Sequence, residues 1–149
     1  MISRSHIGVE SEPRTIEIDR WHLRFFAQAT GETDPVHSEE AAAKAAGFRS
    51  IVAPATFAHA LTLVAPARRG DLFDDLGIDV LRSLHGEQSF TYHRPLCAGD
   101  KVTLITKTVD IYEKKGGTLE FVVQETRILN ENEELCVEAR GVLVVRNIQ

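Results

Sequence analysis

The segment GETDPVH at positions 31–37 places three titratable side chains, Glu32, Asp34 and His37, close together in the chain. Histidine exchanges protons near neutral pH, and a carboxylate beside it adds a second acid–base group. The same segment is also typical of a plain connection between two helices, because glycine suits a helix end and an Asp-Pro pair turns the chain. Both interpretations, a turn and a pair of proton-transfer groups, stay open from these residues alone.

The composition predicts an ordinary globular domain spanning residues 1–149. The chain is 43% hydrophobic and 26% charged, and its formal net charge of −5 argues against nucleic acid or an anionic membrane as the main partner. No stretch approaches the roughly 18 apolar residues of a membrane span. Cys97 and Cys136 lack the spacing of a zinc site or a disulfide framework, which favours free thiols in a cytoplasmic protein. We expect no metal and no cofactor.

The first half of the chain reads as helical. Asp19 can cap a helix that runs through Ala29, with Trp21, Phe25 and Ala29 on one face. Ser38 is expected to cap a second, short helix that ends at Gly47.

The segment Ala53–Arg68 predicts a third helix. Pro54 suits the first helical position, and Phe57, Leu61 and Val64 follow at spacings of four and three residues. Alanines at positions 53, 55, 58, 60 and 65 make this helix small and apolar all round, a pattern that indicates a buried helix.

The remaining pattern is typical of β-strands joined by short turns, which predicts an antiparallel meander. The strands expected in this meander are Glu87–Arg94, Lys101–Glu113, Thr118–Leu129 and Leu135–Arg146, and Arg14–Ile18 is expected to form a separate short strand. One buried helix with several long strands indicates an α+β fold whose sheet wraps around that helix. Such a sheet has a free edge, which a second copy can cover.

Four segments in order resemble the MaoC-like dehydratases of the hotdog superfamily, in particular the branch related to the N-terminal domain of two-domain dehydratases. They are FAQATGETDPVH (26–37), AGFRSIVAPATF (46–57), LHGEQSFTYHRPLCAGD (84–100) and VEARGVLVVR (137–146). The resemblance implies a hotdog fold with Ala53–Arg68 as its central helix. It also implies dimers, and hydration of trans-2-enoyl thioesters of coenzyme A or acyl carrier protein to (R)-3-hydroxyacyl thioesters.

In the hydratase motif Asp-x-Asn-Pro-x-His of that family, Glu32 takes the Asp position, Asp34 the Asn position and His37 the His position. His37 matches, whereas Glu32 carries one more methylene than the family's acid. Asp34 either orients His37 or stands in for that acid. The resemblance thus implies His37, Glu32 and Asp34 as catalytic residues.

The resemblance also implies where the thioester binds. Active hydratases of the family carry His-Gly where this chain has Ala53 and Pro54, and the glycine N–H is expected to hold the thioester oxygen. Pro54 has no N–H, so the N–H of Ala55 is the alternative donor. His59 takes the place of a supporting serine, although a histidine packed in the core or at a dimer interface is the simpler interpretation. Arg94 is a candidate for carrier phosphates, although exposed arginines are common.

Three functions therefore stand side by side. The first is a hydratase or dehydratase that uses His37. The second is a non-catalytic subunit that pairs with another hotdog chain and shapes its acyl tunnel, an interpretation that Glu32 and Pro54 favour. The third is a hotdog thioesterase, which needs a carboxylate to activate water and does not need His37.

Overall fold

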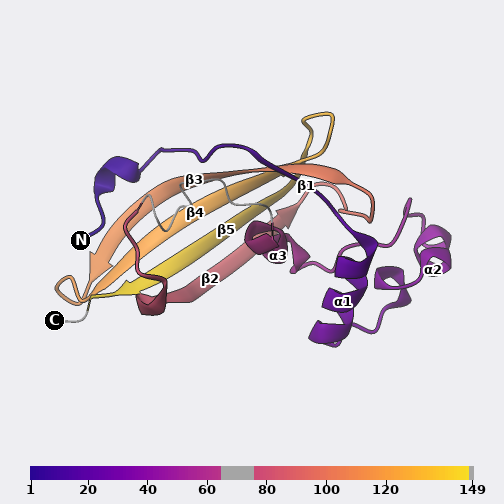
Figure 1. Ribbon diagram of the computed structural model, residues 1–149, viewed down its shortest axis with the longest axis horizontal. Coiled ribbons are helices and arrows are strands. Elements are labelled where there is room, and N and C mark those ends of the chain that lie inside the picture. The colour runs from indigo at the N-terminus through magenta and orange to yellow at the C-terminus, as the bar shows by residue number, and fades with distance from the viewer. Residues whose placement is uncertain (65–75, 148–149) are drawn as a thin grey trace.

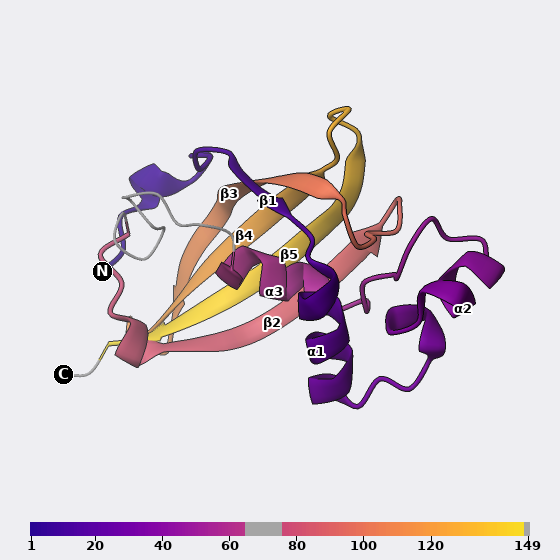
Figure 2. The same ribbon diagram turned by 45° about the vertical axis from the view of Figure 1, so that its right-hand side comes forward.

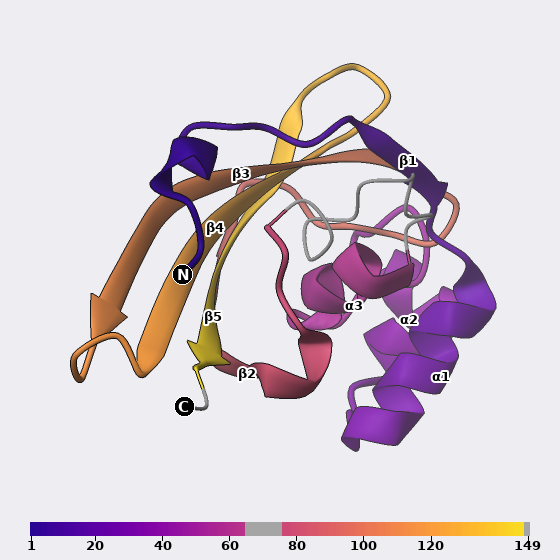
Figure 3. The ribbon, with the colours of Figure 1, turned by 60° about the vertical axis from the view of Figure 1, so that its left-hand side comes forward.

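The protein is built on one curved antiparallel sheet. The computed structural model describes residues 1–64 and 76–147. The strands lie in the order β1-β3-β4-β5-β2, and the sheet curls around a single helix, α3 (Figures 1 and 3). Their bounds are β1 (Arg14–Glu17), β2 (Ser83–Tyr92), β3 (Lys101–Lys114), β4 (Leu119–Leu129) and β5 (Leu135–Arg146). The α+β class predicted from the sequence is confirmed.

The meander prediction holds for three strands and fails for one. β3, β4 and β5 pair in sequence order, and Gly116 and Gly117, with φ of 62° and 84°, turn the chain between β3 and β4. β2 pairs with β5 and not with its neighbour in sequence, β3. β2 therefore forms an edge of the sheet, opposite the short edge strand β1.

The central helix α3 (Phe57–Val64) begins four residues after the predicted start at Ala53. The N–H of Ala53 donates to the carbonyl of Leu96 at 2.8 Å, which keeps Ala53 in an extended segment. The carbonyl of Pro54 then accepts from the N–H of Phe57 at 2.9 Å in a turn. Pro54 thus precedes the helix and is not its first residue. The predicted end at Arg68 lies outside the described residues.

Helix α3 lies on the concave face of the sheet (Figure 2). It is not buried all round. Phe57, Ala58 and Leu61 are buried, whereas Leu63 is 72% and Val64 49% exposed. The prediction that Val64 belongs to a wholly buried helix was wrong, because the sheet covers only one side of α3.

Helix α1 (Arg20–Thr30) is capped as predicted, since the carboxylate of Asp19 accepts from the N–H groups of Trp21 and His22. Its buried residues are Leu23 and Ala27. The face with Trp21 points to solvent instead, and that side chain is 73% exposed. Regular spacing identified a face of this helix, but not the one that packs.

A short 3-10 helix, η2 (Pro35–His37), and the helix α2 (Glu40–Ala45) follow α1. Ser38 ends η2 and does not cap α2, whose N-cap residue Glu39 makes no side-chain cap. Helices α1 and α2 with η2 therefore form a helical group at one end of the sheet (Figure 1).

The apolar core is divided in two along the sheet. One cluster surrounds α3 and includes Phe57, Leu61 and Ile128, while a smaller one at the other end includes Ile111 and Val145. Between them Thr106 and Thr126, both buried, share a hydrogen bond of 2.8 Å. This bond satisfies two hydroxyl groups that would be costly to bury alone.

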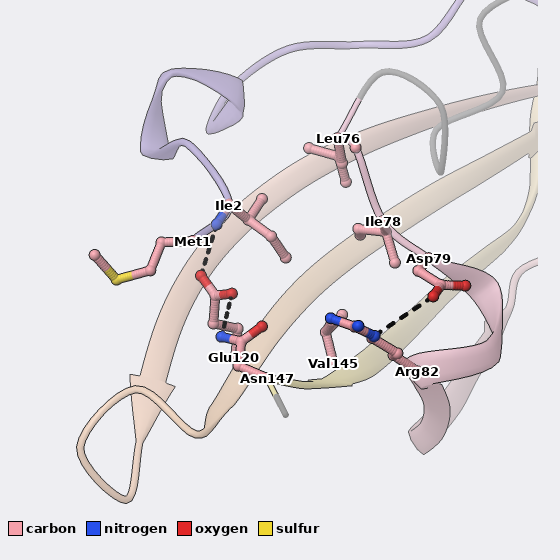
Figure 4. Close-up of a pocket in the computed structure, with 10 residues that line it drawn as sticks. Met1, Ile2, Leu76, Ile78, Asp79, Arg82, Glu120, Val145 and Asn147 are labelled. Atoms are coloured by element: carbon pink, nitrogen blue, oxygen red, sulfur yellow. Dashed lines mark hydrogen bonds and ion pairs between the residues drawn. The ribbon is translucent and has the colours of Figure 1, made fainter. Parts of the chain in front are cut away.

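The far end of the sheet is closed by the buried carboxylate of Glu120 (Figure 4). One oxygen accepts from the N–H of Ile2 at 2.7 Å and the other from the side-chain amide of Asn147 at 2.8 Å. Around them lies an open pocket of about 120 Å³, to which the short 3-10 helix η3 (Val80–Arg82) contributes Arg82. The N-terminal 3-10 helix η1 (Arg4–His6) also lies at this end of the sheet (Figure 1).

Replacing Leu61 by alanine is expected to lower the free energy of unfolding by about 2–5 kcal/mol, because it opens a cavity between α3 and the sheet. Leu63→Ala on the same helix is the matched control and should stay within about 0.5 kcal/mol. Urea unfolding followed by circular dichroism measures both. Equal losses for the two variants would contradict the assignment of the buried face.

Candidate functional site

His37 is held by a single residue of the segment that leads into α3. The N–H of Val52 donates to the carbonyl of Val36 at 3.0 Å, and the carbonyl of Val52 lies 2.8 Å from His37 Nδ1. The GETDPVH loop is therefore fixed against the start of α3 by both backbone groups of Val52. The imidazole is half-buried as a result.

This contact determines the tautomer of His37. A backbone carbonyl only accepts hydrogen bonds, so Nδ1 must carry the proton and donate to Val52. In the neutral ring Nε2 is then the unprotonated nitrogen. Within residues 1–64 and 76–147, Nε2 makes no hydrogen bond. The geometry thus presents a base at Nε2.

The two acids of the loop bind its own backbone. Glu32 accepts from the N–H groups of Thr33 and Asp34 at 2.9 and 3.2 Å, and Asp34 accepts from the N–H of Val36 at 3.0 Å. Neither carboxylate contacts His37 through a hydrogen bond in the described part of the chain. The group that orients His37 is the Val52 carbonyl, a backbone atom that side-chain patterns do not reveal.

The segment just before α3 is contacted by a residue of β2 that the sequence did not reveal as part of the site. Tyr92, at the end of β2, donates its hydroxyl proton to the carbonyl of Ala55 at 2.6 Å. Burial raises the pKa of Tyr92 to about 12, while the backbone N–H of Ala58 acts in the opposite direction. The hydroxyl therefore stays protonated at neutral pH. Its position in an expected strand, far from residue 55 in sequence, gave no signal of this contact.

His59 lies on α3 and stacks on His85 of β2. The ring centroids are 4.7 Å apart and the ring planes differ by 22°. Burial lowers the pKa of His59, and the neighbouring His85 lowers it further. His85 in turn contacts the side-chain oxygen of Gln88 at 3.2 Å. The His59 ring thus packs against β2, and a role of His59 in substrate binding stays a prediction.

Arg94 lies on the surface and pairs with Glu134 at 2.7 Å. The neighbouring His93 contacts Glu138 at 2.8 Å across to β5. These contacts leave carrier binding by Arg94 as a prediction. Cys97 and Cys136 are free and buried, and burial raises the pKa of both thiols.

Two features together define the structural class of this protein. A strongly curved antiparallel sheet surrounds one helix, and a histidine loop is fixed at the start of that helix. These are the features of a MaoC-like dehydratase of the hotdog superfamily. The chain belongs to the family described as "FAS1-like, dehydratase domain region", whose model matches residues 5–139. In the described residues, no helix is both long and apolar enough to span a membrane.

Relatives and solved structures agree with this assignment. A UPF0336 protein of Saccharopolyspora erythraea is 36% identical over 97% of this chain and 92% of its own length. A chain of the C-terminally truncated HadBC (3R-hydroxyacyl-ACP dehydratase) complex of Mycobacterium tuberculosis is 27% identical, with a TM-score of 0.81 over 93% of this chain and 96% of that chain. A structure described as a MaoC-like dehydratase gives a TM-score of 0.83 at 22% identity, over 96% of this chain and 43% of that larger chain.

The stacked histidines make stability depend on pH. The pKa of His59 is lowered from its ordinary 6.5, so the unfolded chain binds a proton more readily than the folded one. This contribution to stability is present above pH 6.5 and is lost as the pH falls below it. Between about pH 7.5 and about pH 5.5, the native protein should lose more unfolding free energy than a His59→Gln variant. Urea unfolding at each pH measures the difference, and parallel curves would contradict it.

Proposed function

We propose that this chain is an (R)-specific enoyl-thioester hydratase or 3-hydroxyacyl-thioester dehydratase. The observation that carries the proposal is the bond between His37 Nδ1 and the Val52 carbonyl, which leaves Nε2 as a base beside the start of α3. The likeness to a chain of the 3R-hydroxyacyl-ACP dehydratase complex supports the same chemistry. The substrate would be an acyl thioester of coenzyme A or acyl carrier protein, handled in the cytoplasm.

In the hydration direction, His37 Nε2 takes a proton from water while the water oxygen attacks the β-carbon of the enoyl thioester. Electrons move to the thioester oxygen, which becomes an enolate. Backbone N–H groups at the start of α3, among them that of Ala55, stabilise this negative charge. The proton held on His37 Nε2, passed on directly or through Glu32 or Asp34, then reaches the α-carbon as the carbonyl re-forms, so that one water is added overall. Dehydration follows the same steps in reverse.

Glu32 and Asp34 are the candidates for the group that exchanges the second proton. Both are exposed, and both already hold the loop through backbone N–H groups. The extra methylene of Glu32 gives its carboxylate a longer reach than the family's aspartate. Its second oxygen makes no hydrogen bond within the described residues, so it is available to a bound substrate.

His37→Gln is expected to lower kcat for the hydration of crotonyl-CoA by about 10²-fold or more, because the variant has no base at that position. The loss of absorbance of the enoyl thioester measures the rate. His6→Gln, at the opposite end of the sheet, is the matched control and should keep the native rate. Equal rates for the two variants would refute the proposed base.

Glu32→Gln separates the two roles of Glu32. The glutamine keeps a side-chain oxygen that can accept from Thr33 and Asp34, but it cannot exchange a proton. A catalytic Glu32 predicts a fall in kcat of about 10²-fold with unchanged thermal stability. If Glu32 only holds the loop, kcat will remain near the native value, and Asp34→Asn will then test the other acid.

A second candidate is a non-catalytic subunit that shapes the site of another hotdog chain. Pro54 lacks the N–H that the family uses, and the HadBC complex contains two kinds of chain. Among residues 1–64 and 76–147, β2 pairs only with β5, so its outer edge can accept a partner strand.

The subunit proposal predicts a chain that is inactive alone and active only after co-purification with a second hotdog protein. Size-exclusion chromatography combined with the crotonyl-CoA assay tests it. A homodimer with full turnover would exclude this proposal. Release of free thiol from acyl-CoA, detected colorimetrically, would instead indicate the thioesterase alternative.

A further inference from the structure

The orientation of the peptide group between Ala55 and Thr56 is held by a hydrogen bond from another element of the fold, the strand β2. Tyr92 of β2 donates to the Ala55 carbonyl at 2.6 Å. A trans peptide is planar, so its N–H points away from its carbonyl. By holding the carbonyl of Ala55, Tyr92 therefore also fixes the direction of the Thr56 N–H.

The N–H of Thr56 is an available donor. Thr56 is exposed, and within residues 1–64 and 76–147 its N–H has no acceptor. The next N–H, of Phe57, is already bound to the Pro54 carbonyl. The Thr56 carbonyl accepts from the N–H of His59 at 3.1 Å, so Thr56 is anchored to the first turn of α3.

Ala55 provides an internal comparison. Its N–H belongs to the peptide group whose carbonyl is that of Pro54, and this carbonyl is held by Phe57 within the same turn. The direction of the Ala55 N–H thus depends on local structure. The direction of the Thr56 N–H depends on Tyr92, and hence on the edge strand β2.

We propose that Tyr92 is a positioning residue that aims the N–H of Thr56 at the thioester oxygen, and so supplies the donor that Pro54 lacks. The inference rests on the hydratase function proposed above, because that reaction places negative charge on this oxygen. The inference adds a specific donor, the N–H of Thr56, and the residue of β2 that orients this donor, Tyr92.

Tyr92→Phe removes the hydroxyl and keeps the ring. A misdirected donor reduces the stabilisation of the transition state more than it reduces the affinity for the substrate. The kcat for crotonyl-CoA should therefore fall about tenfold with little change in KM. Tyr112→Phe is the matched control: Tyr112 of β3 stacks on Phe121 with centroids 4.8 Å apart, and its hydroxyl makes no hydrogen bond within the described residues. It should keep the native kcat and KM.

A second readout does not depend on turnover. In ¹H–¹⁵N NMR spectra, addition of butyryl-CoA, a saturated thioester that cannot be hydrated, should move the amide proton of Thr56 downfield. In the Tyr92→Phe variant this shift of the Thr56 amide proton should become smaller. Any shift that butyryl-CoA causes at the Ala55 amide proton should be the same in the variant and in the native protein.

The two readouts separate the inference from the function beneath it. A Thr56 shift that needs Tyr92, in a protein without hydratase activity, supports the donor assignment and refutes the reaction. Active protein whose Thr56 amide ignores butyryl-CoA, or whose Tyr92→Phe variant keeps the native kcat, refutes the inference and leaves the hydratase proposal in place. A Thr56 amide that does not respond in an inactive protein refutes both.

Discussion

The geometry of the candidate site depends on the backbone of residues 51–53, whose N–H and C=O groups form hydrogen bonds with two different segments of the chain. On one side Val52 bonds to Val36 and His37. On the other, Ala53 donates to Leu96 and the carbonyl of Ile51 accepts from Ala98. This extended segment therefore joins the histidine loop to the turn before β3. A substitution that bends it would displace His37 and the start of α3 together, because the same few peptide groups hold both.

The edge strand β2 makes the second set of contacts with α3. Tyr92 holds its start, and His85 stacks on His59 one turn further along. The register of β2 shifts between His85 and Glu87, and a Cβ at the intervening Gly86 would lie 2.8 Å from the Val144 side chain. The bulge thus needs glycine, and it changes the direction in which the side chains before it point. A partner strand added to β2 would pair beside residues that contact the helix.

The sequence predicted the strands well, because alternation of side chains is local and each turn is marked by glycine or asparagine. The order of the strands was not predictable in this way, since the pairing of β2 with β5 depends on distant segments. His37 was found through a motif, but its partner is a backbone carbonyl, which has no signature in side chains. Tyr92 was missed for the same reason: its acceptor, the carbonyl of Ala55, becomes visible only when β2 meets α3.

The hydrogen-bonded band formed by Thr106 and Thr126 also has a consequence for motion. It lies between two separate clusters of buried apolar side chains, so the free energy of opening need not be uniform along the strands. The region around α3 can loosen while the end closed by Glu120 stays folded. Amide hydrogen exchange would then occur in two groups, one around α3 and one at the end closed by Glu120.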